Sequence, residues 1–292
     1  MKIKIFIFFS MCLFLNRSYA QMPETHIYLI NYFKDGNNLK TTDIFKISES
    51  VGYNNQPSFS TDCKQIYYTS NIADSLQTDL YAYDISKRKS NKISNTNLSE
   101  YSPMIQPGAA FALSYVRVEV DKKQNLRSYS ADYSSPKNLV PCSDSVGYYV
   151  WSDSSNLGLI ILNNGLEFHT YRLGDPNTKL VANKVGRFLN YNGNSKDYVF
   201  LDKDSTLETI KYFNTKSRII EKTIQTLNDC EDYAIDSNSD IFGSNGGRLF
   251  QYNGSEWELA ADLTKQIGPF YRMNFCNCGR HLCVVSYNGK KP

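Results

Sequence analysis

The sequence has no apolar run long enough to cross a membrane as a helix. The most apolar stretch, residues 5–15, is about half the roughly 20 residues that a bilayer requires. It follows Lys2 and Lys4 and precedes Ser18-Tyr19-Ala20, which has the small-x-small pattern of a signal-peptide cleavage site. We therefore predict that residues 1–20 are a signal peptide cleaved after Ala20. The mature chain, residues 21–292, is then expected to be periplasmic or secreted, with no transmembrane segment.

The predicted mature chain also lacks an excess of charge. Of the 32 basic residues, the predicted signal removes three, and it removes none of the 29 acidic residues, so 29 of each remain. A neutral chain gives no reason to expect a polyanionic partner. We expect no nucleic acid partner.

Cysteine and helical periodicity are scarce as well. Six of the 7 cysteines follow Ala20, which is too few for a fold built on disulfides; they are Cys63, Cys142, Cys230, Cys276, Cys278 and Cys283. Their pairing is open, and a Cys276–Cys283 disulfide is one candidate. No stretch of 11 or more residues has sustained helical periodicity. The chain is therefore expected to be all-β.

The chain contains a repeat instead. Six segments each consist of a short extended run, a polar turn and a second run of β-branched, aromatic or aliphatic residues, which is typical of a β-hairpin. They span residues 56–70, 102–116, 148–162, 187–201, 232–245 and 272–286. Six equivalent positions, here called the anchors, are spaced by 46, 46, 39, 45 and 40 residues; they are Phe59, Ile105, Trp151, Asn190, Ile235 and Phe275. This spacing is typical of the blades of a β-propeller.

Two further strand-like runs follow each complete hairpin, so the predicted unit is a blade of four antiparallel strands. The last hairpin has no such runs after it, whereas residues 26–33 and 39–48 are surplus strands before the first hairpin. We predict a six-bladed β-propeller over residues 21–292 in which these N-terminal strands pair with the C-terminal hairpin. Closing the ring in this way removes free sheet edges. A β-sandwich or an irregular all-β fold is the alternative.

Residues 52–70, GYNNQPSFSTDCKQIYYTS, followed by TDLYAYDI (78–85), resemble the WD40-like (PD40) repeat of bacterial exported TolB-like propellers. Further pieces in the same order extend the resemblance over nearly the whole mature chain. It implies the propeller fold and an exported protein. The usual Asp-Gly turn of the repeat is replaced here by Asp62-Cys63. The motif residues are structural, so the resemblance carries over no specific activity.

Loops entering the innermost strands of a propeller line one mouth of its central channel. Three positions before the anchors stand Gln56, Ser102, Tyr148, Arg187, Asp232 and Arg272, and Glu100 and Glu231 lie close by in sequence. Arginines, carboxylates and tyrosines that converge in this way suit a polar or charged group. We predict a ligand-binding channel mouth formed by Glu100, Tyr148, Arg187, Glu231, Asp232 and Arg272. The alternative is that these groups only pair with one another and buttress the ring.

The sequence gives little support for catalysis or for a metal. It has no Gly-x-Ser-x-Gly motif, and its three histidines, His26, His169 and His281, fall in unrelated positions. Cys276-x-Cys278-x-x-His281-x-Cys283 offers four soft-metal ligands, but a strand hairpin would spread them along both faces. We expect no cofactor, no metal and no catalytic residue.

The predicted function is that of an exported, monomeric binding or scaffold protein of the bacterial envelope. It would present its channel mouth to a protein or a small polar ligand. A hydrolase or lyase acting on carbohydrate or peptide is the alternative.

Overall fold

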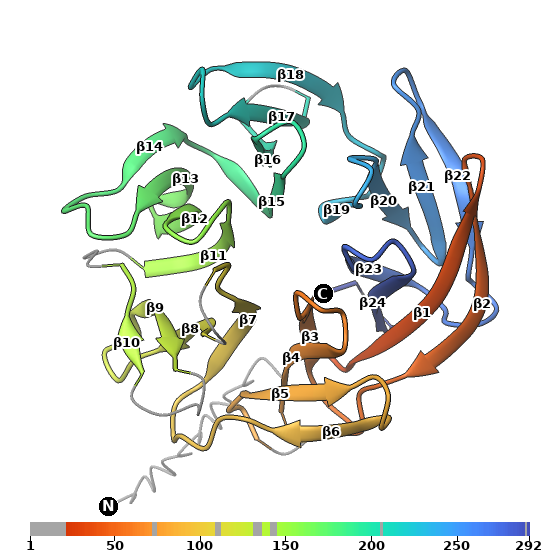
Figure 1. Ribbon diagram of the computed structural model, residues 1–292, viewed down its shortest axis with the longest axis horizontal. Helices are drawn as coiled ribbons and strands as arrows, with labels where there is room; N and C mark the ends of the chain where they lie inside the picture. The colour runs from red at the N-terminus through yellow and green to blue at the C-terminus, as the bar shows by residue number, and fades with distance from the viewer. Residues whose placement is uncertain are drawn as a thin grey trace, which may run out of the picture.

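The computed structural model describes residues 22–71, 75–108, 112–130, 136–140, 145–204, 207–289 and 291–292. These residues form six four-stranded antiparallel sheets, arranged as blades around a central axis (Figure 1). The predicted signal peptide, residues 1–20, and Cys142 lie outside the described residues. Within the described part of the chain, no helix is long and apolar enough to span a membrane.

Each blade runs from an innermost strand at the axis to an outermost strand at the rim. The first three blades consist of β3 (Asn54–Phe59), β4 (Gln65–Ser70), β5 (Asp79–Asp84) and β6 (Lys89–Lys92); β7 (Glu100–Ile105), β8 (Leu113–Val118), β9 (Gln124–Tyr129) and β10 (Lys137–Asn138); and β11 (Ser145–Trp151), β12 (Asn156–Asn163), β13 (Gly165–Arg172) and β14 (Lys179–Ala182). The fourth and fifth consist of β15 (Val185–Asn192), β16 (Asp197–Asp202), β17 (Thr209–Asn214) and β18 (Ile220–Gln225); and β19 (Tyr233–Ile235), β20 (Ile241–Asn245), β21 (Arg248–Tyr252) and β22 (Trp257–Asp262).

The sixth blade joins the two ends of the described chain. Its order is β23 (Phe270–Phe275), β24 (His281–Tyr287), β1 (Thr25–Asp35) and β2 (Asn38–Lys46). β1 pairs antiparallel with β24 from Thr25 opposite Tyr287 to Asn31 opposite His281. The predicted closure of the ring is therefore confirmed, and Figure 1 shows β1 beside β24 with β2 outside it.

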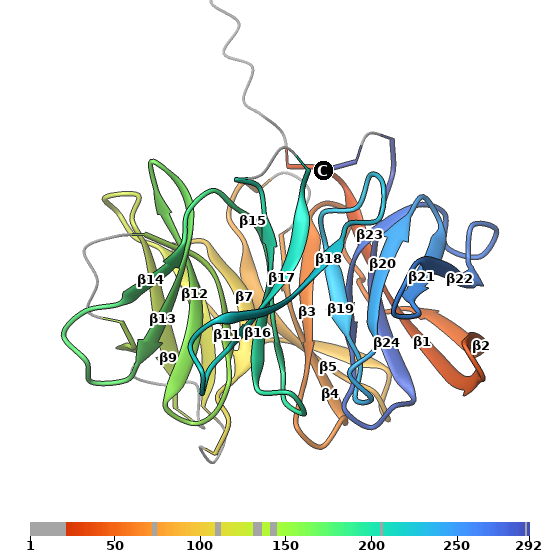
Figure 2. The same ribbon diagram turned by 90° about the horizontal axis from the view of Figure 1, so that it is seen from above.

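The hydrophobic core is divided among the interfaces between blades. Six clusters of buried side chains occur, and each contains residues from two neighbouring blades. Figure 2 shows the blades standing side by side around the axis. Because a buried cluster fills each interface between them, both faces of an inner strand are covered. All six residues of β16 are buried, whereas five of the six residues of the outer strand β18 are exposed. This explains why the inner strands read as continuous apolar runs rather than as alternating ones.

Disulfide pairing differs from the candidate raised by the sequence. Cys276 bonds to Cys63 of the first blade, not to Cys283, which is a free and buried cysteine. The register explains the difference, because Cys283 lies opposite Asn274, whereas the backbone N–H of Cys276 bonds to the carbonyl of His281. Cys283 packs instead in the core between the sixth and first blades.

Candidate functional site

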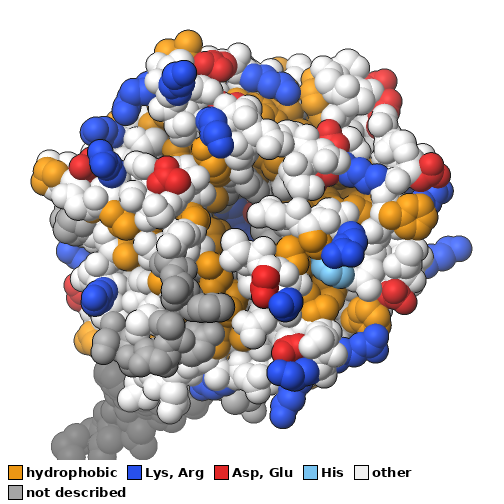
Figure 3. All heavy atoms as spheres, viewed as in Figure 1, with side chains coloured by type: hydrophobic (Ala, Val, Ile, Leu, Met, Phe, Trp, Pro, Cys, Tyr) orange, Lys and Arg blue, Asp and Glu red, His pale blue; other side chains and the backbone are white. Residues whose placement is uncertain are grey.

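All six blades contribute to one cavity of about 160 Å³ on the propeller axis. Its lining includes the six positions that stand three residues before the anchors: Gln56, Ser102, Tyr148, Arg187, Asp232 and Arg272. The space-filling view shows a hollow near the middle of one face, with basic side-chain atoms at its base (Figure 3). The alignment of the repeats thus placed these residues around a common space.

β-bulges aim these side chains at the axis. The pairing register shifts in five of the six innermost strands, between Asn55 and Ser58 in β3 and at the corresponding points of β7, β11, β15 and β23. Gln56 and Ser102 take left-handed backbone conformations there, with φ of 55° and 53°. A bulge inserts an extra residue and redirects the side chains beside it. In these five strands the channel residues lie at or beside the shift, whereas Asp232 directly precedes β19, which is regularly paired.

Two guanidinium groups share one carboxylate in this cavity. Arg187 Nη2 lies 2.7 Å and Nε 2.9 Å from Asp232 Oδ2, and Arg272 Nη2 lies 3.5 Å from Asp232 Oδ1. The exposed fractions of the three side chains are 20%, 14% and 8% for Arg187, Arg272 and Asp232. The inner cavity therefore carries a formal charge of +1 in a partly desolvated place.

Arg272 is held from several sides. Its Nη1 donates to Asn55 Oδ1 at 2.9 Å, and its guanidinium lies 5.7 Å from the ring centre of Tyr271 and 5.9 Å from that of Tyr148. Burial opposes its charge, but the attraction of Asp232 and the nearby tyrosines outweighs burial and raises the pKa of Arg272. Burial has the opposite effect on the nearby phenol: it raises the pKa of Tyr53, which therefore stays neutral beside the arginine.

Glu231 lies at the edge of the site and turns away from the inner cavity. Its Oε1 accepts from Lys203 Nζ at 2.9 Å, and its Oε2 is 3.9 Å from Arg187. Its side chain is 45% exposed, and its bond to Lys203 lowers the pKa of its carboxyl group. Lys203 also pairs with Glu208 at 3.2 Å. These outer charges are exposed to solvent and are screened more than the inner ones.

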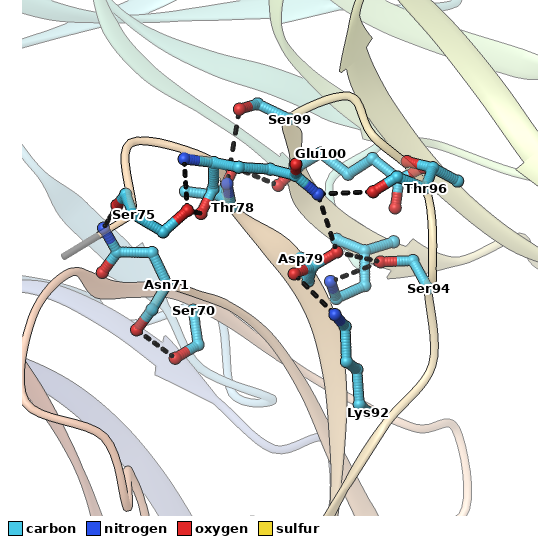
Figure 4. Close-up of polar contacts among 12 residues, drawn as sticks. Ser70, Asn71, Ser75, Thr78, Asp79, Lys92, Ser94, Thr96, Ser99 and Glu100 are labelled. Atoms are coloured by element: carbon cyan, nitrogen blue, oxygen red, sulfur yellow. Dashed lines mark hydrogen bonds and ion pairs between the residues drawn. The ribbon is translucent and has the colours of Figure 1, made fainter. Parts of the chain in front are cut away.

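Glu100 does not line this cavity, which corrects its predicted place at the channel mouth. It is fully buried between the first two blades, where Tyr129 donates to its Oε1 at 3.1 Å and Thr96 at 3.4 Å. Figure 4 shows it in a cluster with Asp79, which pairs with Lys92, and several hydroxyl side chains. Glu100 pairs with Arg117 before the bulge of β7 begins, so its side chain enters the layer between blades.

Sequence reasoning missed Asn55 and Tyr271. Asn55 bonds to Arg272 and to the hydroxyl of Tyr271, and so joins the first blade to the sixth. Each residue stands one position before a channel residue of its own blade. The predicted closure of the ring could have identified these two residues, because it makes the first and sixth blades neighbours.

A second, wider cavity of about 560 Å³ lies at the ends of the innermost strands. All six anchors line it: Phe59, Ile105, Trp151, Asn190, Ile235 and Phe275. It shares Ser58, Met104, Val150, Asn190 and Asn274 with the smaller cavity, so the two are successive sections of one channel. The wide section combines the mostly apolar anchors with polar side chains and Asp236, whereas the narrow section holds Arg187, Arg272 and Asp232.

The four potential soft-metal ligands between Cys276 and Cys283 are separated by the fold, as a strand hairpin requires. Cys283 is buried in the core, and His281 Nδ1 is 2.7 Å from Asn31 Oδ1. Among the described residues, the one group of three potential metal ligands is Cys63, Cys276 and Cys278, in which two sulfurs form the disulfide. The other histidines pair with acids, His26 with Glu24 and His169 with Glu167.

Comparison with known proteins supports the fold. No family model and no curated protein matches the sequence. Among solved structures, a putative TolB from Agrobacterium tumefaciens superposes with a TM-score of 0.66 at 12% identity, covering 92% of this chain and 99% of that one. TolB from Acinetobacter baumannii gives 0.60 at 12% identity, covering 92% of this chain but 65% of that one. Oligogalacturonate lyase from Vibrio parahaemolyticus gives 0.58 at 11% identity, covering 89% and 91%. The predicted resemblance to TolB propellers is thus confirmed for the fold.

Proposed function

We propose that this chain, which has the six-bladed fold of TolB-like propellers, is an exported, non-enzymatic binding protein whose channel holds an anionic group of a small ligand. The observation that carries this proposal is the shared carboxylate. Arg187 and Arg272 both approach Asp232 in a cavity to which every blade contributes.

Mutual pairing accounts for only part of this arrangement. Of the described residues, Asp232 supplies the one carboxylate that lines the inner cavity beside the two guanidinium groups. The next carboxylate, Glu231, approaches Arg187 only at 3.9 Å from the exposed edge of the site, where Lys203 binds it more closely. A partly buried charge that is paired only loosely is costly, and a bound anion reduces that cost. Each guanidinium has five N–H donors in a planar fork, so donors remain for a carboxylate or a similar planar anion.

The size of the cavity limits the ligand. Sites for drug-sized molecules usually measure roughly 300–1,000 Å³, whereas this section measures about 160 Å³. It suits a small acid, or the acidic group of a larger molecule that continues into the wider section. Export rests on the predicted signal peptide, and the protein is proposed to act as a monomer in the periplasm or outside the cell.

Isothermal titration with a panel of small carboxylates tests the proposal. The panel includes galacturonate, because the fold is shared with oligogalacturonate lyases, and each acid is compared with its neutral amide or alcohol. We expect at least one acid to bind and its neutral analogue not to bind. Arg187→Gln is expected to weaken binding by about tenfold or more, because a hydrogen bond to a charged group contributes about 1.5–3 kcal/mol.

Arg248→Gln is the matched control. Arg248 also pairs with an aspartate, Asp262 at 3.1 Å, but on an exposed outer strand. Its substitution is expected to leave binding unchanged. Equal losses in the two variants, or no binding of any acid, would contradict an anion site in the channel. Conversion of a panel compound to product would contradict the non-enzymatic assignment.

A further inference from the structure

Three cysteine sulfurs meet where the first and sixth blades join. Cys63 lies in the turn between β3 and β4, and Cys276 directly follows β23. Their disulfide links positions 213 residues apart in sequence. Cys278 follows two residues later in the turn before β24, and the three Sγ atoms all lie within 4.8 Å of one another. A free thiol thus lies beside a disulfide that joins two blades.

Cys63 occupies a turn position with a left-handed backbone conformation. Cys63 has a φ of 56°, and its aligned partner in the sixth blade is Gly279, with a φ of 68°. Glycine adopts this left-handed conformation freely, whereas other residues pay roughly 1 kcal/mol or more. Ser239 takes the same conformation at the equivalent position of the fifth blade, with a φ of 73°, so the turn accepts side chains of different chemistry. At Cys63 the side chain in this turn forms the disulfide to Cys276.

Cys278 differs from the other free thiols of the described chain. Cys230 and Cys283 are buried, and burial raises the pKa of Cys230 to about 11 and that of Cys283 well above its ordinary value. Cys278 is partly exposed, and its backbone N–H donates to Cys276 Sγ at 3.4 Å. It is therefore the free thiol placed to meet both the disulfide and a molecule from solvent.

The geometry points to a thiol–disulfide exchange site at this seam, in which Cys278 displaces Cys276 from Cys63. The Cys278 thiolate attacks Cys63 Sγ, the Cys63–Cys276 bond breaks as the Cys63–Cys278 bond forms, and Cys276 leaves as a thiolate that takes up the proton lost by Cys278. The number of disulfides is unchanged, so no oxidant or reductant is consumed. Either isomer keeps the two blades joined, and the site would take external thiols or disulfides through Cys278 or Cys63, which are both partly exposed. This inference is independent of the channel site.

Disulfide mapping tests the exchange. The full chain is incubated at mildly alkaline pH, quenched in acid, alkylated and analysed by peptide mass spectrometry. We expect two isomers in the wild type, one with Cys278 alkylated and one with Cys276 alkylated. The Cys278→Ser variant is expected to keep Cys63–Cys276 alone, and the core variant Cys283→Ser to give the wild-type pair of isomers.

The Cys276→Ser variant gives a second, decisive readout. In a buffer of oxidised and reduced glutathione it is expected to form Cys63–Cys278 in most molecules. A single wild-type isomer at every incubation time, or a Cys276→Ser protein that leaves Cys63 and Cys278 reduced, would overturn the proposal. Circular dichroism of each variant shows whether a missing bond reflects loss of the fold rather than of the exchange.

Discussion

Single residues in this propeller take their roles from the bulges of the innermost strands. Arg187 and Arg272 reach the channel because the register shifts beside them. Glu100, two positions before Ser102, enters the layer between blades because its own part of β7 is still regularly paired. The alignment of the repeats could place Arg187 and Arg272 in the channel but could not place Glu100. It gives the position of a residue along a strand, but not the point at which a bulge interrupts the alternation of side chains between the two faces.

Glu100 leads to a prediction about pH. Burial raises the pKa of its carboxyl group above the ordinary value of 4.5. The folded state therefore keeps a proton that the unfolded state has already lost, and stability falls as pH rises from about 4.5 through the raised pKa. Glu100→Gln cannot ionise, so its stability relative to the wild type is expected to increase with pH across this window.

Urea unfolding of both proteins from about pH 4 to about pH 8 measures this difference. Gln retains an acceptor for Tyr129 Oη, so the packing of the layer is preserved. Stability curves that stay parallel over the whole range would show that Glu100 is not the group responsible.

At the scale of elements, the bulged innermost strands depend on close approach to their neighbours. Gly186 stands beside Arg187 in β15, and a Cβ there would lie 2.6 Å from Leu201 Cδ2 of β16. Gly186→Ala is expected to lower the free energy of unfolding by about 1–3 kcal/mol, the usual cost of overpacking. It should also weaken binding of the channel anion, because the strand shift moves Arg187.

Gly193→Ala is the control for this prediction. Gly193 lies in the turn of the same hairpin, and a Cβ there would meet nothing within 4 Å. Urea unfolding should give a change within about 0.5 kcal/mol for this variant. Equal effects at the two glycines would mean that the close contact of β15 with β16 does not support the bulge.

The elements themselves were largely predictable from the sequence. Five of the six anchors prove to be the last residues of innermost strands, and Asn190 lies two residues before the end of β15. The hairpin pattern and its spacing predict these strand ends directly, because each blade packs against its neighbours in the same way. The bulges left no comparable signal, since they depend on contacts with the next strand and not on residue type alone.

At the scale of the whole molecule, closure of the ring determines both sites. It brings Asn55 of the first blade to Arg272 of the sixth, and Cys63 to Cys276. The surplus strands at the N-terminus predicted the seam, but not which side chains would meet across it. To predict those contacts, the orientation of the first blade relative to the sixth must be known. The hydrophobic pattern of the sequence does not specify it.

A crystal structure of the protein with the tightest-binding carboxylate of the panel tests the central claim most directly. We predict that the carboxylate lies in the narrow section of the channel, within hydrogen-bond distance of both Arg187 and Arg272. Their pairing with Asp232 should be retained by at least one guanidinium. A ligand bound only in the wider section or on the outer surface, with the arginine pair unchanged, would contradict the account.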